Sequence, residues 1–115
     1  MLMRIAIFVL AHVLFLGVAV AIAAAQGASP YDTRFETRHD AAVMAGPEEG
    51  SAVTGQIADG TEGIVLRWCR PEFPFHEWAF GGRDMHRRLL DERVCEVSVN
   101  GQVAGFVRGS DLAPE

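Results

Sequence analysis

The first 25 residues most constrain what this chain can fold into. Arg4 is the only charged side chain before Asp32, and an apolar run extends over residues 5–25. The run ends in small residues that satisfy the Ala-x-Ala pattern of signal peptidases, and its second half is rich in alanine. We therefore expect residues 1–25 to be a signal-peptide helix, cleaved after Ala25, and the product to be periplasmic or secreted. The alternative is a retained membrane anchor, because the run is just long enough to span a bilayer.

The chain that follows the apolar run is short and acidic. About 90 residues remain, which is enough for one small domain with a marginal core. Every basic residue is an arginine, and without Arg4 nine arginines face fifteen Asp and Glu residues, so the net charge is near −6. Such a surface argues against nucleic acid and anionic lipid as partners, because both bind basic proteins. We expect a monomer with no cofactor, no metal ion and no membrane contact after cleavage.

Two cysteines, Cys69 and Cys95, lie in the exported part of the chain. Small domains in oxidising compartments often carry a covalent crosslink, so we predict a disulfide between them. It would close a loop of about 26 residues and stabilise the fold by roughly 3 kcal/mol. Zinc binding together with His76 and His86, or catalysis by a Cys–His pair, are the alternatives. The zinc set lacks the close ligand pairs of structural sites, and a thiol on an inward strand face would be inert.

Strand and turn signals define the organisation after residue 25. Residues 26–39 are polar and small and predict a flexible leader, and residues 40–115 are expected to form a single domain. Three strands are predicted first, over residues 40–44, 52–57 and 62–68. The second of them offers Val53 and Ile57 as core candidates.

The C-terminal part of the chain carries the clearest pattern. Cys95, Val97 and Val99 alternate with polar residues, which predicts a strand with one buried face. Asn100-Gly101 then predicts a type I′ hairpin turn, because both residues tolerate positive φ, and a partner strand is expected over 103–107. Short strands and glycine turns with little helix predict an all-β fold, a small β-barrel of about five to six strands.

Two short motifs follow one another near the start of the domain: residues 42–47, Ala-Val-Met-Ala-Gly-Pro, and residues 53–61, Val-Thr-Gly-Gln-Ile-Ala-Asp-Gly-Thr. They resemble the opening Asn-Val-Arg-x-Gly-Pro and the second strand and turn of bacterial SH3-like (SH3b) domains. Cys95-Glu96-Val97 with Gly105-Phe106-Val107 resembles the closing Trp-Cys-x-Val and Gly-Trp-Val elements. The resemblance spans about residues 41–112. It implies an SH3-like β-barrel, here standing alone, that acts as an extracytoplasmic binding module for peptidoglycan or peptides.

The segment between the third strand and the last hairpin is the candidate binding region. From Glu72 to Asp91 it has no alternating pattern, and long connections of this kind are often functional. Met85, Leu89 and Leu90 are spaced for one or two helical turns. Aromatic and arginine side chains concentrate in and beside the segment. The candidate ligand-binding set is Trp68, Phe73, Phe75, Trp78, Phe80, Arg70 and Arg83.

These side chains allow two interpretations. They can cover an open end of the barrel as core, or they can line an exposed groove. In a groove flanked by Arg70, Arg83, Arg87 and Arg88, aromatic rings would stack on sugars or receive an extended peptide, while the arginines would bind carboxylates. That interpretation predicts an exported, non-catalytic module that binds peptidoglycan or an envelope protein or peptide. A small inhibitor of a cell-wall lytic enzyme is the alternative, since an acidic surface suits a basic hydrolase. A Cys/His hydrolase is a more remote one.

Overall fold

A computed structural model describes residues 29–115 of the chain. The predicted signal peptide, its cleavage site and residues 26–28 of the predicted leader lie outside the described residues. The strands are β1 Arg34–Thr37, β2 Ala41–Met44, β3 Val53–Ile57, β4 Ile64–Arg70, β5 Val94–Val99, β6 Gln102–Arg108 and β7 Leu112–Pro114. The helices are α2 Phe75–Phe80, α3 Arg83–Asp91 and the short 3-10 helix η1 Gly109–Asp111.

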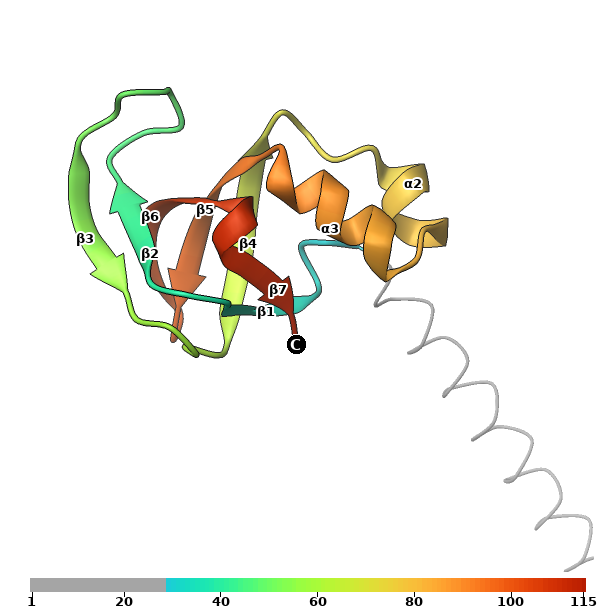
Figure 1. Cartoon of the computed structure of the whole chain (residues 1–115), viewed down its shortest axis with the longest axis horizontal. Coiled ribbons are helices and arrows are strands. Elements are labelled where there is room, and N and C mark those ends of the chain that lie inside the picture. Colours follow the sequence, from blue (N-terminus) through green and yellow to red (C-terminus); the bar gives the residue numbers. More distant parts are fainter. Residues whose placement is uncertain (1–28) are drawn as a thin grey trace, which may run out of the picture.

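The strands form one antiparallel sheet in the order β3-β2-β6-β5-β4-β1-β7. Both α-helices lie between β4 and β5 in the chain and occupy one end of the molecule, while β3 lies at the opposite end (Figure 1). The prediction of a mostly β fold is confirmed, with seven strands in residues 29–115 instead of five to six. In this part of the chain neither helix is long and apolar enough to cross a membrane.

The β5–β6 hairpin follows directly from the sequence pattern. Cys95 and Val97 on β5 are fully buried. Asn100 and Gly101 have φ angles of 52° and 78°, as the predicted type I′ turn requires. Gly105 on β6 has a φ of 135°, and a Cβ there would lie 2.7 Å from a β2 side chain. Glycine at this position therefore allows β2 to pack closely against β6.

A β-bulge in β4 changes which side chains face the core. Ile64 and Leu66 are buried, and the register with β5 shifts between Leu66 and Trp68. The inward position therefore passes to Cys69 instead of Trp68. Cys69 lies opposite Cys95 on β5, and the two sulfur atoms form the predicted disulfide.

The boundary of the predicted leader needs correction. Residues 34–37 form β1, which pairs with β4 on one side and with β7 on the other. Phe35 is fully buried, and the buried Thr37 donates from its hydroxyl to the carbonyl of Ala58. The sequence conceals this strand because it has four residues, of which only Phe35 and Thr37 face inward. The folded domain therefore begins before residue 40.

Tyr31 ties the chain before β1 to the core. Its ring packs edge-on against Phe73, with centroids 6.1 Å apart, and its hydroxyl donates to Glu72. Burial, and then the hydrogen bond to Glu72, raise the pKa of Tyr31 from 10.0 to about 12. The folded state thus prefers the neutral phenol. Tyr31 stabilises the fold below pH 10.0, and this contribution is lost as the pH rises toward 12.

We expect the single tyrosine of the chain to titrate near pH 12 in the folded protein and near 10.0 after unfolding. The ultraviolet absorbance of the phenolate measures both values without interference from another tyrosine. Glu72→Gln should lower the native midpoint, because it removes the carboxylate that opposes ionisation. Glu49→Gln, on the β2–β3 loop, is the control and should leave it unchanged. A native midpoint near 10.0 would show that Tyr31 is not packed in this way.

Of the two core candidates on β3, only Ile57 is confirmed. Ile57 is buried, whereas Val53 is 67% exposed. The register between β2 and β3 shifts between Val43 and Met44, next to the partner of Val53. β3 is moreover an edge strand whose first four residues are all exposed, so the apolar character of Val53 does not indicate burial.

The predicted helical turns are confirmed by α3, in which Leu89 and Leu90 are buried and Met85 packs against the core. α2 lacks a comparable signal, because only Trp78 of its six residues is buried. Gly81 joins the two helices, and a Cβ there would lie 2.3 Å from a backbone oxygen of α2. This glycine therefore permits the tight junction that sets the two helices against each other.

Candidate functional site

A groove of about 570 Å3 lies between the two helices and the β1–β7 side of the sheet. We call it the helix–edge groove. The helices line it with Trp78, Ala79, Arg83, His86 and Arg87, and the opposite wall consists of Thr33, Ala113, Pro114 and Glu115. That wall is formed by the two ends of the described chain, which the pairing of β1 with β7 brings together.

Trp78 belongs both to this groove and to the core. It is 3% exposed, and its ring centroid lies 5.1 Å from that of Phe73 and 6.3 Å from that of Phe35. His86 stacks on the indole with centroids 3.8 Å apart and planes inclined by 13°. Nε2 of His86 lies 2.7 Å from the carbonyl oxygen of Trp78, and because a carbonyl can only accept, Nε2 carries a proton. The imidazole is thus fixed as a flat side of the groove.

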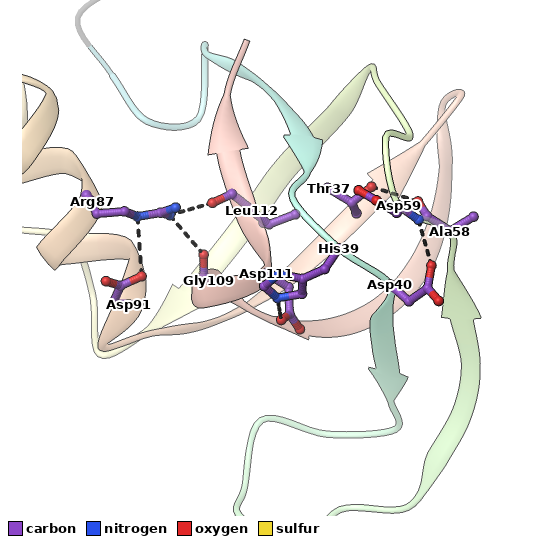
Figure 2. A network of polar contacts seen from close by, with 10 residues as sticks. All are labelled: Thr37, His39, Asp40, Ala58, Asp59, Arg87, Asp91, Gly109, Asp111 and Leu112. Atoms are coloured by element: carbon purple, nitrogen blue, oxygen red, sulfur yellow. Dashed lines mark hydrogen bonds and ion pairs between the residues drawn. The ribbon is translucent and has the colours of Figure 1, made fainter.

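Arg87 fastens α3 to the β7 end of the sheet (Figure 2). Its Nη2 donates to the carbonyl oxygen of Leu112 and, at 3.4 Å, to that of Gly109. Its Nε lies 3.3 Å from Oδ1 of Asp91, an ion pair without the alignment of a hydrogen bond. Burial, and then the nearby Arg38, lower the pKa of the Arg87 guanidinium, while Asp91 acts in the opposite direction. Arg87 therefore holds the groove walls together.

Arg83 is the exposed cation of the helix–edge groove. It is the first residue of α3 and forms no ion pair within residues 29–115. On the facing wall, Oε1 of Glu115 accepts a hydrogen bond of 2.6 Å from the backbone N–H of Gly63. The groove thus combines the imidazole of His86, which lies on the buried indole of Trp78, with an open guanidinium. This arrangement suits a ligand that has a flat or apolar part and a carboxylate.

A second set of polar contacts braces the turn between β1 and β2 (Figure 2). Nε2 of His39 lies 2.5 Å from Oδ1 of Asp111, and the carboxylate of Asp40 accepts from the backbone N–H of Asp59. These contacts connect the β1–β2 turn to η1 and to the β3–β4 turn. They help to fix η1, and hence the β7 wall of the groove, against β1.

The structure places the predicted ligand-binding residues in separate locations. Phe73 and Trp78 are core residues, 7% and 3% exposed. Phe75 and Phe80 are 63% and 80% exposed on α2. Aromatic residues that are close in the sequence therefore divide between core and surface, and the core interpretation holds for Phe73 and Trp78.

Trp68 and Arg70 lie on β4, outside the helix–edge groove. Trp68 packs edge-on against Phe106, with centroids 5.1 Å apart, and the guanidinium of Arg70 lies 5.1 Å from the centroid of the Trp68 ring. Of the predicted set, Trp78 and Arg83 line the groove together.

Several groove residues were outside the sequence-based prediction. Thr33 and residues 113–115 carry no local signal, because only the pairing of distant strands places them side by side. Arg87 is among the arginines predicted to flank a groove, and both His86 and Arg87 carry a local signal. They follow Arg83 by three and four positions, and a helix over this segment places all three on neighbouring positions of its surface.

The cysteines are joined in the disulfide, so neither the zinc set nor the Cys–His pair has its thiolate in this structure. Among residues 29–115, no group of three or more His, Cys, Asp and Glu side chains is placed to hold a metal ion. His76, a member of the proposed zinc set, lies against Phe80 with ring centroids 4.9 Å apart.

Comparisons of the chain with protein-family models, with curated proteins and with solved structures find no match. The resemblance to SH3b domains therefore rests on the sequence motifs, and the functional argument rests on the geometry of the groove.

Proposed function

We propose that this chain is an exported, non-catalytic SH3-like β-barrel that binds cell-envelope material, peptidoglycan or an envelope protein or peptide, in the helix–edge groove. The observation that carries the proposal is the stacked Trp78–His86 pair in one groove with the exposed Arg83. The antiparallel sheet and the motif resemblance support the barrel. The apolar N-terminal run and the disulfide support export, because disulfides persist in oxidising compartments.

Peptidoglycan presents the chemical groups that this groove suits. Its stem peptides carry free carboxylates, which arginine binds through paired N–H donors. Its sugar rings offer weakly polar faces that pack on aromatic and small apolar side chains such as Ala79 and Pro114. The groove volume of about 570 Å3 also falls within the range of small-ligand sites. A sugar–peptide fragment is therefore the ligand class that we favour.

Arg83→Glu should weaken binding to purified peptidoglycan about tenfold. The substitution replaces the exposed cation of the groove with a negative charge, which repels the carboxylate of the ligand. Co-sedimentation at low salt, with protein produced from the complete sequence, measures the bound fraction. Arg88→Glu is the matched control, since Arg88 is exposed on the same helix, undergoes the same charge change and does not line the groove. Equal losses in the two variants, or no co-sedimentation of the unchanged protein, would overturn the proposal.

A further inference from the structure

The edge strand β7 is closed to further pairing. Backbone N–H and C=O groups of alternate β7 residues point toward β1. Those of Leu112 and Pro114 point away from β1, toward the open edge of the sheet. The N–H of Leu112 donates to Gly109, and its carbonyl accepts from Arg87. Proline has no N–H to donate. No outward-facing donor of β7 is therefore left for another strand.

The β3 edge, by which we mean the outer side of Val53–Ile57, lacks such protection. β3 pairs with β2 on its inner side, but no strand within residues 29–115 pairs with its outer side, and its first four residues are exposed. The strand contains neither proline nor a charged residue, two features by which proteins usually protect an edge. It therefore presents unpaired backbone donors and acceptors to solvent.

A second feature of the β3 edge is the glycine at the centre of the strand, Gly55. Its φ lies outside the left-handed region, and a Cβ at this position would meet no atom within 4 Å. The fold itself therefore has no steric need for glycine here, although glycine within a strand is destabilising relative to alanine. Glycine within a strand marks a bulge, such as the register shift with β2 beside Gly55, or a place that another backbone can approach closely.

The charges around the β3 edge select the class of partner. Glu48 and Glu49 precede the strand, and Asp59 follows it, with Asp40 bonded to the backbone of Asp59. All four are exposed, and they outnumber Arg108, which shares a hollow with Glu48 and Glu49. A second copy of the chain would bring acidic ends together whether the two strands paired parallel or antiparallel, and like charges oppose such pairing. We propose that the β3 edge binds an extended segment of another protein, an uncharged stretch of about five residues flanked by Lys or Arg.

This surface is separate from the proposed ligand groove. β3 lies at the end of the molecule opposite α2 and α3 (Figure 1). The inference therefore goes beyond the proposed function, and the two can fail independently. Co-sedimentation with peptidoglycan reports on the groove, whereas strand addition reports on the β3 edge.

The test uses a labelled peptide of about ten residues, in which alternating Thr and Val are flanked by two arginines at each end. Fluorescence anisotropy should show saturable binding that weakens as salt is raised. Gln56→Lys places a like charge on the edge and should weaken binding at least about tenfold. Gln102→Lys makes the same change on β6, two strands away, and should leave the affinity unchanged. Hydrogen exchange should show new protection of amides in residues 53–57 when the peptide is bound.

Three results would overturn the inference. The first is equal binding of a peptide that has glutamates in place of the arginines. The second is binding that Gln56→Lys does not weaken, or that leaves the exchange of residues 53–57 unchanged. The third is a concentration-dependent dimer in sedimentation whose formation protects residues 53–57, because the occupant of the edge would then be a second copy.

Discussion

Trp78→Ala should lower the free energy of unfolding by about 3–5 kcal/mol. The indole is 3% exposed and contacts rings from three separate parts of the chain, those of Phe35, Phe73 and His86. Its removal leaves a cavity where β1, α2 and α3 meet, and these elements cannot close together without losing their own packing. A small domain has only about 5–15 kcal/mol of net stability, so this one change removes a large share of it.

Unfolding in guanidinium chloride measures the effect, and Phe80→Ala is the matched control. Phe80 is two positions away on the same short helix but is 80% exposed. Its replacement should change stability by no more than about 0.5 kcal/mol. If the two substitutions had similar effects, the assignment of Trp78 to the core would be wrong. The predicted loss also explains why Arg83, and not Trp78, is the residue for a binding test: Arg83 can be changed without opening the core.

The parts of the fold that the sequence predicts are those governed by local rules. The type I′ turn at Asn100-Gly101 depends on two residues that accept positive φ, and β5 shows an alternation of buried and polar residues. The disulfide prediction depends on the expected oxidising compartment and on the number of cysteines, and neither requires a tertiary contact to be known. For this reason the C-terminal hairpin and the crosslink between Cys69 and Cys95 are both predicted correctly.

The features that escape prediction depend on contacts between distant segments. β1 is only four residues long, and what stabilises it is its place between β4 and β7 rather than any property of its own sequence. The helix–edge groove requires the same pairing, since Thr33 and Glu115 come from opposite ends of the described chain. A period-two pattern also cannot anticipate the β4 bulge that turns Cys69 inward in place of Trp68.

The aromatic cluster shows the same limit within a single helix. Phe75, Trp78 and Phe80 all belong to α2, which is too short for its apolar residues to establish a helical period. Composition therefore cannot decide which ring is buried. The three-residue spacing from Phe75 to Trp78 would place both on one face, yet only Trp78 reaches the core, where it packs against Phe35, Phe73 and His86.

Loss of the disulfide should lower the free energy of unfolding by roughly 3 kcal/mol. Cys69 and Cys95 are 26 residues apart, and the loop that they close contains both α2 and α3. The crosslink thus joins β4 and β5 at the base of the segment that carries the groove. Without the crosslink, the conformational entropy of the unfolded chain rises because the loop is no longer closed, whereas the folded state is not stabilised. In a domain of this size the result should be a clear fall in the denaturation midpoint.

Two comparisons separate the crosslink from the buried sulfur atoms. Reduction keeps both sulfur atoms in the core, whereas the double substitution Cys69→Ala, Cys95→Ala removes the crosslink together with their packing volume. The substituted protein should therefore be less stable than the reduced one, and both should be less stable than the oxidised protein. Thiol titration of the unreduced protein under denaturing conditions should find no free thiol. Two free thiols, or equal midpoints for oxidised and reduced protein, would show that the loop between β4 and β5 does not depend on a crosslink.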